Sequence, residues 1–388
     1  MEQTEATKKD NLTLSKDQET ALARVQHWYK SWKDGETKQQ VFFLAGWAGT
    51  GKTTVANLFS ESLDKKDRVL YGSFTGKATL RMRQAGMGNA RTLHSMIYKL
   101  EGVEKKKPVF KLDHKSVLKN ASLLVLDECS MVDKNLGEDV LSFGVPVLIL
   151  GDKGQLPPVR GTGYFTSRKP DATLNEVHRQ ALDNPIIQLA TDIRRGHPIR
   201  KINEDKLVTF PQKIKTMEYI MGVDQILCGR NNVRRNINDI VRSTLGHTTT
   251  YPNKGEKIIC LRNNNKEGIF NGMMGSMQED ANYQHGIVNL HFIDDEGNDH
   301  KIEAHPEGFE NDELFKEMDY RLKNQLNEVT HGYAITVHKS QGSEWESVCL
   351  VDDGMFGWDR DTRKKWLYTA VTRAEDRLVI LKAPQEFK

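Results

Sequence analysis

The sequence predicts an α/β protein in which helices cover parallel sheets, with a small antiparallel β module inserted in its second half. Three observations support this. Short apolar runs alternate with segments of helical periodicity between residues 41 and 150, and the alternation starts again near residue 184. Between residues 254 and 305 the runs instead alternate apolar with polar residues and are separated by Asn, Gly and Asp turns. Short apolar strands that alternate with helices are typical of parallel sheets buried on both faces.

The first half begins with a charged tail, residues 1–13, that we expect to be disordered, followed by helical periodicity over Leu14–Trp32. The expected strands are Val41–Ala45, Arg68–Phe74, Ser122–Leu126 and Pro146–Leu150. The expected helices start near Gly51, Gly76, Thr92 and Asp133.

The second half shows the same alternation of strands and helices before and after the β module. Its expected α/β elements are the helix Asn184–Arg195, the strand Gln225–Cys228, the helix Asn231–Leu245, the strand Ser347–Val351, the helix Arg363–Arg373 and the strand Arg377–Leu381. The expected strands of the module are Lys257–Leu261, Met274–Gln278, Ile287–Ile293 and His300–Ala304. Residues 307–327 are polar and are expected to form a helical or loose connection.

Composition is that of an ordinary globular protein. The chain has 388 residues, of which 37% are hydrophobic, enough for two or three domains. A net charge of +3 permits a nucleic-acid partner without indicating one. Its four cysteines are far apart and lack metal-binding spacing, so we expect buried free thiols in a reducing, cytoplasmic compartment. The sequence shows no apolar run of membrane-spanning length, and no membrane partner is expected.

A glycine-rich loop with the sequence GWAGTGKT stands where the strand ending at Ala45 should turn into a helix. Backbone N–H groups in such a loop can surround phosphates, Lys52 can reach the terminal phosphates, and the Thr53 hydroxyl can bind Mg²⁺. The alternative is a structural glycine turn, but a strand before and a helix after favour a nucleoside triphosphate site. The candidate binding residues are Gly46, Gly49, Thr50, Gly51, Lys52, Thr53 and Thr54.

Two acidic residues, Asp127 and Glu128, follow an apolar strand and so lie at the edge where α/β proteins bind ligands. Asp127 can hold Mg²⁺, partly through water, while Glu128 can deprotonate the attacking water. Taken alone, the pair could also be a solvated strand end. Gln155, beyond the next strand, can sense a γ-phosphate.

Positive charge is also needed where the phosphoryl group is transferred, and a two-lobed ATPase can supply it from the opposite lobe. Arg179 and Arg373 are the candidates for this role. Most arginines on helices only keep the protein surface soluble. The assignment of Arg179 and Arg373 to the phosphoryl group therefore depends on the motifs around them.

The ordered motifs of this chain resemble those of superfamily 1 helicases, most of all the 5′→3′ branch of RecD-like and phage Dda-like enzymes. The resemblance spans nearly the whole chain. The motifs that carry it are Leu14–Gln18, Gly46–Thr54, Thr75–Ala78, Thr92–Ser95, Asp127–Met131, Gly151–Val159, Thr336–Gly342 and Tyr368–Arg373.

This resemblance implies two RecA-like P-loop lobes that hold ATP between them, with single-stranded DNA across both. It implies that Gln18 contacts adenine and that Arg179 and Arg373 reach in from the second lobe. The residues it assigns to the DNA backbone are Thr75, Lys77, His94, Thr336, His338 and Ser340. Helix capping is an equal alternative for Thr92 and Ser340, and His338 could be an ordinary buried histidine.

The resemblance also implies two insertions. The β module corresponds to an SH3-like domain that helps to enclose the strand. A short β-hairpin at about residues 101–118 would split the duplex, with Phe110 stacking at the junction, although Phe110 could equally pack down onto the surface. The domain boundaries implied are 14–170, 171–253, 254–327 and 328–388, and a large extra arm after the module is not expected.

The sequence as a whole predicts an ATP- and Mg²⁺-dependent DNA helicase of the host or cellular cytoplasm. The expected partners are single-stranded DNA, duplex junctions and single-strand-binding or replisome proteins, and we expect a monomer. The alternatives are a single-strand translocase or RNA remodeller without unwinding, a nucleic-acid-independent P-loop NTPase or kinase, and a binding module without turnover.

Overall fold

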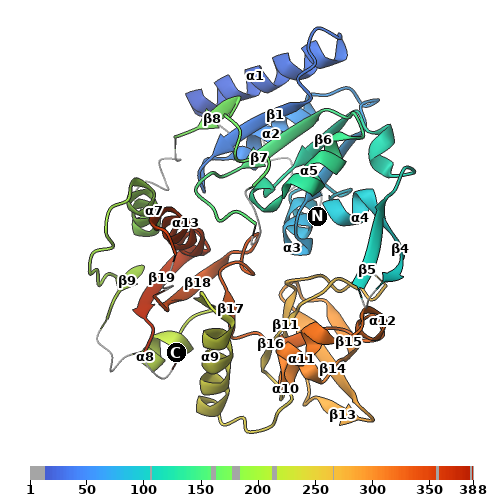
Figure 1. Cartoon of the computed structure of the whole chain (residues 1–388). Coiled ribbons are helices and arrows are strands. Elements are labelled where there is room, and N and C mark those ends of the chain that lie inside the picture. The colour runs from blue at the N-terminus through green and yellow to red at the C-terminus, as the bar shows by residue number, and fades with distance from the viewer. Residues whose placement is uncertain are drawn as a thin grey trace, which may run out of the picture.

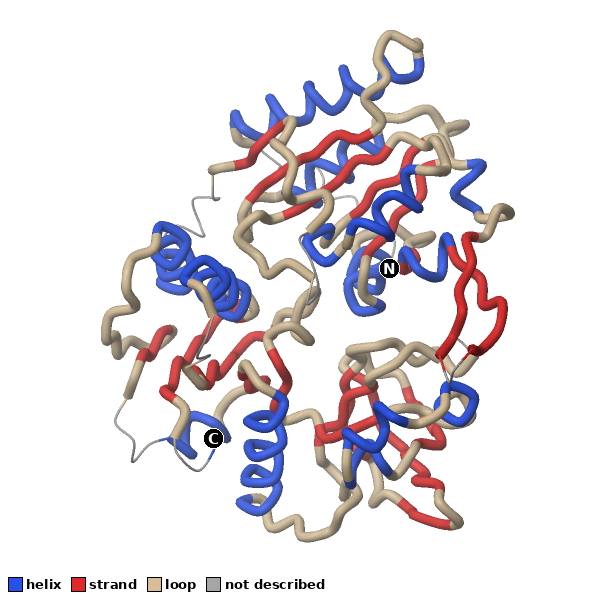
Figure 2. The backbone as a smooth tube through the Cα atoms, viewed as in Figure 1, coloured by secondary structure: helices blue, strands red, loops and turns tan. Residues whose placement is uncertain are grey.

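The protein has two α/β lobes and a β module, shown in the computed structural model of Figure 1. The structure describes residues 14–104, 107–158, 163–176, 184–211, 216–264, 266–354, 358–384 and 387. The first lobe occupies the top of the view, the second lobe the lower left and the module the lower right. Figure 2 shows that helices flank the strands of both lobes, whereas strands dominate the module.

The first lobe is built on a six-stranded, wholly parallel sheet. In sheet order its strands are β3 (Arg91–Thr92), β2 (Val69–Ser73), β6 (Leu123–Leu126), β7 (Val147–Gly151), β1 (Val41–Gly46) and β8 (Ala172–Leu174). Its helices are α1 (Lys16–Lys33), α2 (Lys52–Glu61), α3 (Gly76–Gln84), α4 (Leu93–Ile97) and α5 (Lys134–Leu141), with short 3₁₀ turns at Val117–Asn120 and Cys129–Met131.

Alternation along β1 shows how this sheet is buried on both faces. Phe42 and Leu44 pack with the apolar residues of α1 and α2, whereas Val41 and Phe43 pack with those of α4 and α5. The four strands predicted here are confirmed to within a residue or two at each end. β8 was not predicted, and it extends the first sheet past residue 170, where the sequence places the end of this lobe.

The second lobe also has a wholly parallel sheet, which contains five strands. In sheet order they are β17 (Ala334–Thr336), β10 (Gln225–Cys228), β18 (Trp345–Asp352), β19 (Ala374–Lys382) and β9 (Leu207–Thr209). The helices are α7 (Pro185–Arg195), α8 (Thr216–Met221), α9 (Asn231–Thr244) and α13 (Arg360–Val371). The fold class predicted from the sequence is therefore confirmed, although the three-residue strands β9 and β17 were missed.

The β module is an antiparallel sheet inserted between α9 and β17. Its path runs β13 (Asn282–Gln284), β14 (Ile287–Asp294), β12 (Met274–Met277), β11 (Lys257–Cys260) and β16 (Val329–His331), and β15 (Asp299–Ala304) pairs with β14. The connection that follows β15 forms three short helices, α10 (Glu307–Glu310), α11 (Asp312–Glu317) and α12 (Tyr320–Lys323). The returning strand β16 completes the sheet.

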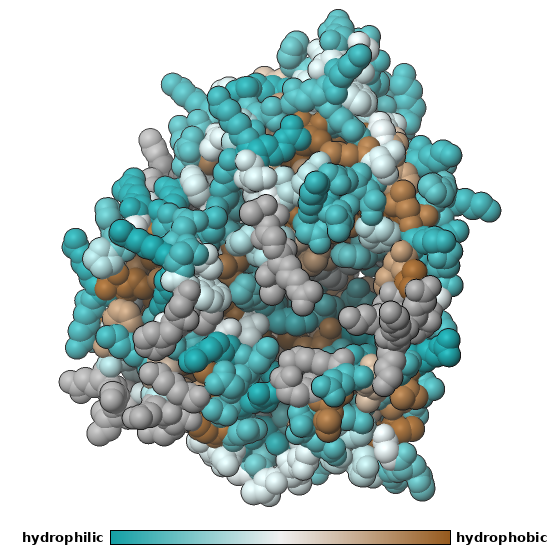
Figure 3. Space-filling view, in the orientation of Figure 1, coloured by the Kyte–Doolittle hydropathy of each residue, from teal (hydrophilic) through white to brown (hydrophobic). Residues whose placement is uncertain are grey.

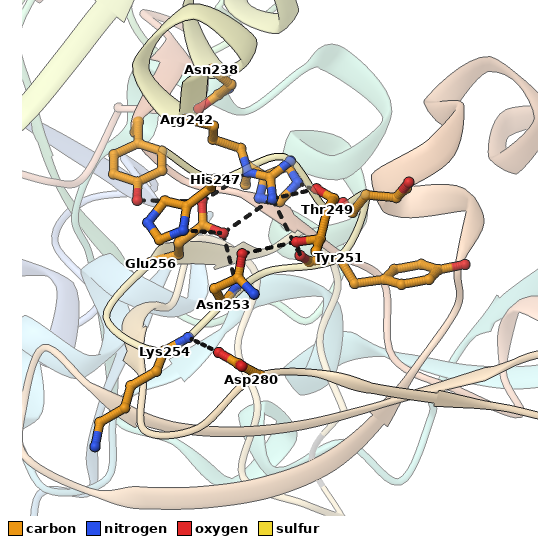
Figure 4. A network of polar contacts seen from close by, with 12 residues as sticks. Asn238, Arg242, His247, Thr249, Tyr251, Asn253, Lys254, Glu256 and Asp280 are labelled. Atoms are coloured by element: carbon orange, nitrogen blue, oxygen red, sulfur yellow. Dashed lines mark hydrogen bonds and ion pairs between the residues drawn. The ribbon is translucent and has the colours of Figure 1, made fainter. Parts of the chain in front are cut away.

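A buried ion pair joins the end of α9 to the start of the module (Figure 4). Arg242 donates from Nε to Glu256 Oε1 at 2.8 Å and from Nη2 to Glu256 Oε2 at 3.1 Å. Glu256 also accepts from the backbone N–H of Asn253 at 2.8 Å, and Arg242 donates to the carbonyl of Thr249 at 2.6 Å. Because both charges are buried and hydrogen-bonded on several sides, this bend of the chain is held firmly.

A β-hairpin projects from the first lobe, made of β4 (Tyr98–Glu104) and β5 (Lys107–Leu112). A hairpin was predicted at about residues 101–118; the structure has one over residues 98–112, and its role as a duplex-splitting insertion stays a prediction. The face of the molecule in Figure 3 is mostly hydrophilic, with apolar residues in small separate groups.

All four cysteines are buried free thiols, as predicted. None of the described helices is long and apolar enough to cross a membrane.

Candidate functional site

The glycine-rich loop joins β1 to the first turn of α2. Gly51 caps α2 with a φ of +79°, a left-handed conformation that favours glycine. A Cβ on Gly46 would lie 2.6 Å from Thr50 Oγ1, so this position also requires glycine. The loop therefore wraps tightly and presents backbone N–H groups at a helix N-terminus, the arrangement that binds phosphate.

Side chains around the loop hold its backbone carbonyls. Lys52 Nζ donates to the carbonyls of Gly46 and Trp47, both at 3.0 Å, and the Thr50 hydroxyl donates to Trp47 at 2.8 Å. Gln18 is buried; its Nε2 donates to the Thr50 carbonyl at 3.0 Å, and its Oε1 accepts from the Ser15 N–H at 3.0 Å. Gln18 thus fastens α1 to the loop, and its contact with adenine stays a prediction.

The predicted carboxylates lie beside this loop at the end of β6. Glu128 has a φ of +53°, and its N–H donates to Asp127 Oδ1 at 2.8 Å. Burial raises the pKa of Glu128 to about 7; the charge of Asp127 adds to the rise, while Arg373 and Lys52 oppose it. A carboxyl group with this pKa is suited to accept a proton near neutral pH.

Asp127 and Thr53 supply oxygen ligands that fit a magnesium ion. Burial raises the pKa of Asp127. Three interactions oppose this rise: the hydrogen bond that Asp127 accepts from the Glu128 N–H, the charge of Lys52 and a hydrogen bond with the Thr53 side chain. A carboxylate next to a hydroxyl, at the first turn of a helix, is a donor set that Mg²⁺ prefers. Thr54, the next residue of α2, is partly buried.

The loop after β7 is attached to the second lobe. Gln155 is buried and its Oε1 accepts from the Ser130 hydroxyl at 3.5 Å. The next residue, Leu156, is held at both backbone atoms: its N–H donates to Thr369 Oγ1 at 2.9 Å, and its carbonyl accepts from Gln341 Nε2 at 3.0 Å. The loop that carries Gln155 is therefore bonded to the second lobe through the neighbouring residue, Leu156.

Arg373 lies just past the end of α13 and is 2% exposed. Its guanidinium donates from Nε to the Thr369 carbonyl at 3.0 Å and from Nη1 to the Ser343 carbonyl at 2.9 Å. Burial raises the pKa of both Glu128 and Asp152, and the charge of Arg373 opposes that rise, so Arg373 acts on carboxylates of the first lobe from the second. The other predicted finger, Arg179, lies outside the described residues.

Tyr368 is a cleft residue that the sequence did not single out. It lies five residues before Arg373, and its hydroxyl accepts from the Ala48 N–H at 3.1 Å and donates to Asp152 Oδ2 at 2.7 Å. Its position inside a helicase-like motif was the available signal. Only the packing of the two lobes shows that it meets the phosphate loop.

Two predicted strand-binding residues, Thr75 and Lys77, lie at the start of α3. Thr75 caps this helix by accepting from the Ala78 N–H at 3.2 Å. Lys77 Nζ pairs with Asp295 Oδ2 of the module at 3.6 Å and lies 4.9 Å from the centre of the Trp345 ring. Burial lowers the pKa of Lys77 and Asp295 opposes that shift. The first lobe and the module therefore meet at this lysine.

The remaining predicted strand-binding residues differ in accessibility. His94 is exposed and stands edge-on to Phe74, whereas His338 is partly buried and stands edge-on to Trp358. Desolvation by the surrounding protein lowers the pKa of both histidines, although nearby Asp133 opposes the shift at His94.

The two hydroxyl residues of this group are buried. Thr336 Oγ1 accepts from the Lys339 N–H at 3.4 Å, and the Ser340 hydroxyl donates to the Val337 carbonyl at 2.8 Å. Thr92 caps α4, as the alternative interpretation had it.

The hairpin carries an exposed apolar pair. Phe110 on β5 lies directly opposite Leu100 on β4, and they are 52% and 50% exposed. Phe110 therefore projects into solvent instead of packing down onto the lobe.

Family models match both lobes of the chain. The AAA domain matches residues 14–209, about half of the chain, and the UvrD-like helicase C-terminal domain matches residues 331–381. The second match contains β17, β18, α13 and Arg373, which form the far side of the cleft.

Curated relatives match most of this chain. The ATP-dependent RecD2 DNA helicase of Deinococcus radiodurans is 28% identical over 86% of this chain and 46% of its own length. The ATP-dependent DNA helicase Pif1 of Campylobacter jejuni is 26% identical over 86% of both chains. The dda helicase of phage T4 is 32% identical over 42% of this chain and 39% of its own length. The match covers less than half of the length of two of these three relatives.

Solved structures share the fold. Bacteroides Pif1 bound to single-stranded DNA has a TM-score of 0.60 at 18% identity, covering 97% of this chain and 94% of that one. Pif1 helicase from Candida albicans has a TM-score of 0.55 at 17% identity, covering 97% and 98%. The chain therefore belongs to the AAA domain family and, with its UvrD-like C-terminal domain, to the superfamily 1 helicases of the RecD, Pif1 and Dda-like group.

Proposed function

We propose that this protein is an ATP-dependent DNA helicase that translocates 5′→3′ on single-stranded DNA and unwinds duplexes in replication, recombination or repair. The observation that carries the proposal is the composition of the cleft. Its phosphate loop and carboxylates come from the first lobe, whereas Arg373, whose charge acts on Glu128, comes from the second. Relatives named ATP-dependent DNA helicases support the same activity.

The residues of the first lobe would bind and activate the nucleotide. Loop N–H groups and Lys52 would hold the phosphates, and Thr53 and Asp127 would hold Mg²⁺, Asp127 partly through water. Bound Mg·ATP supplies the phosphoanhydride bond whose hydrolysis drives the cycle. Glu128 would take a proton from the attacking water because its pKa is about 7.

The residues of the second lobe would make hydrolysis depend on lobe closure. Arg373 would leave its carbonyl partners and stabilise charge on the phosphoryl group, with Arg179 as the second candidate. Gln155 would report the γ-phosphate to the second lobe through its neighbour Leu156. Because the two lobes would hold the strand alternately, each round of closure and opening would move them along it.

The strand would run between the first lobe, the second lobe and the module, over Thr75, Lys77 and His94 and past His338. Contacts with phosphates and stacking would make binding independent of sequence and steeply dependent on salt. The exposed Phe110 would meet the duplex junction. The protein would act as a monomer in the cytoplasm, alongside single-strand-binding or replisome proteins.

The decisive experiment measures the ATPase rate with and without single-stranded DNA. We expect strong stimulation, which Lys52→Ala should abolish while strand binding persists. Lys66→Ala is the matched control, since Lys66 is exposed and pairs only with Asp64 among the described contacts. ATPase activity indifferent to DNA or RNA would contradict the proposal and favour a nucleic-acid-independent NTPase.

Direction of movement needs a separate measurement. Partial duplexes with either a 5′ or a 3′ single-stranded tail should be unwound only from the 5′ tail. Hydrolysis without strand separation on either substrate would instead indicate a translocase. Stronger stimulation by RNA than by DNA would point to an RNA remodeller.

A further inference from the structure

The phosphate loop touches the second lobe directly, through the hydroxyl of Tyr368. This hydroxyl accepts a hydrogen bond from the Ala48 N–H at 3.1 Å and donates one to Asp152 Oδ2 at 2.7 Å. Ala48 belongs to the loop, Asp152 follows β7, and Tyr368, 3% exposed, belongs to α13. One phenol therefore joins two nucleotide-site segments of the first lobe to a helix of the second.

A second set of contacts surrounds the same point. The Trp47 ring stands edge-on to the Tyr368 ring, with centroids 6.4 Å apart at 79°. The guanidinium carbon of Arg194, on α7, lies 3.9 Å from the centre of the Trp47 ring. Trp47 also packs against the apolar core of the second lobe. The residue before Ala48 is thus held between two helices of the opposite lobe.

This contact lies where a bound phosphate would change the loop. Lys52 Nζ donates hydrogen bonds to the carbonyls of Gly46 and Trp47. These two residues directly precede Ala48, whose N–H contacts Tyr368. A triphosphate that drew Lys52 toward itself would release both carbonyls and alter the loop at Trp47 and Ala48. That change would alter the hydrogen bond of Tyr368, because its hydroxyl accepts from the Ala48 N–H in the same stretch of backbone.

The helix that carries Tyr368 also reaches the other parts of the site. Thr369, the next residue, accepts the Leu156 N–H, and Arg373 follows five residues after Tyr368. Asp152, the partner of Tyr368, also accepts the Gly154 N–H at 2.8 Å, next to Gln155. A shift of α13 would therefore move Arg373 and the loop carrying Gln155 together.

We propose that Tyr368 is a positioning residue that couples the nucleotide held by the phosphate loop to closure of the lobes and placement of Arg373, with Trp47 and Arg194 as the packing around it. This inference rests on the proposed function, since it concerns the same ATPase cycle. It assigns Tyr368 no contact with the reacting atoms.

The test uses Tyr368→Phe, which keeps the ring against Trp47 and removes only the hydroxyl. We expect kcat of the DNA-stimulated ATPase to fall about tenfold or more, as for loss of hydrogen bonds to a charged group, with KM for ATP within about threefold. We also expect a non-hydrolysable ATP analogue to change single-stranded DNA affinity much less than in the wild type. Tyr251→Phe is the matched control, because it removes a hydroxyl bonded to a carboxylate, that of Glu310, away from the cleft.

The outcomes separate this inference from the proposed function. A wild type whose ATPase ignores DNA would overturn the function itself. A stimulated wild type with a Tyr368→Phe variant of unchanged kcat and unchanged nucleotide-dependent DNA affinity would overturn only the role of Tyr368. If Tyr368→Phe does not fold, Arg194→Gln, on a partly exposed side chain, carries the test: it should weaken the same coupling, and wild-type coupling would overturn the inference.

Discussion

The pKa of Glu128 makes a quantitative prediction for the pH dependence of catalysis. Burial next to Asp127 raises this pKa from 4.5 to about 7. Since a general base must be ionised, only about one tenth of the protein would be active at pH 6, and kcat/KM should fall tenfold for each further pH unit. An unperturbed glutamate would keep full activity down to about pH 5.

The same shift predicts a change in stability with a definite sign. Because the pKa is higher in the folded protein than in the unfolded chain, ionising Glu128 disfavours folding as pH rises from about 4.5 to 7. The full effect, about 3 kcal/mol, is present above pH 7. Glu128→Gln should therefore be more stable than the wild type at pH 8 by about this amount, and nearly equal to it at pH 4.5.

Both effects can be measured on the same proteins. The assay is DNA-stimulated ATPase, with kcat/KM for ATP taken from pH 5.5 to 8.5, together with urea denaturation at pH 4.5 and 8. Glu128→Gln should lower turnover by about a hundredfold or more. Glu138→Gln, an exposed glutamate on α5, is the control and should change neither quantity. A kcat/KM that stays constant from pH 8.5 down to pH 5.5, or substantial turnover in Glu128→Gln, would refute the reasoning.

Three further predictions follow from contacts between the parts of the molecule. Arg373→Lys keeps a positive charge but loses the planar fork, so ATP affinity should stay within about threefold while kcat falls about a hundredfold or more; unchanged turnover would exclude a finger role. Asp295→Asn removes the partner of Lys77, so single-stranded DNA affinity measured by fluorescence anisotropy should rise about two- to fivefold, and unaltered affinity would count against competition at this lysine. Arg242→Met leaves Glu256 buried without its partner and should reduce the free energy of unfolding by about 3–5 kcal/mol in urea denaturation; a loss below about 1 kcal/mol would contradict the assigned burial.

The sequence predicted the long apolar strands well, because their patterns are local. β1 and β7 are continuous runs of six and five buried residues, a pattern typical of strands in a parallel sheet that is covered on both faces. The three-residue strands β8 and β16 are too short to show a period, and their pairing depends on distant partners. β16 was for this reason missed as a part of the module's sheet.

Candidate site residues were predictable to the extent that their chemistry is fixed by a local motif. Lys52 and Glu128 follow directly from strand, loop and spacing. Tyr368 was missed because its role depends on a contact between residues 320 positions apart in the sequence. The contact of Gln18 with adenine stays a prediction, whereas the hydrogen bond from its amide to the phosphate loop is one that spacing alone does not reveal.

The returning strand β16 has a practical consequence for exchanging domains between helicases. Its edge pairing with β11 is supplied by residues 329–331, and only two residues separate it from β17 of the second lobe. A graft that takes only residues 254–327 would lack β16. The grafted module would then miss one strand, and the edge of β11 would be left unpaired. Chimeras should therefore carry residues 329–331 with the module and keep Gly332 and Tyr333 unchanged, because the Gly332 N–H donates to the Lys257 carbonyl of β11 and the Tyr333 carbonyl accepts from the Ile226 N–H of β10.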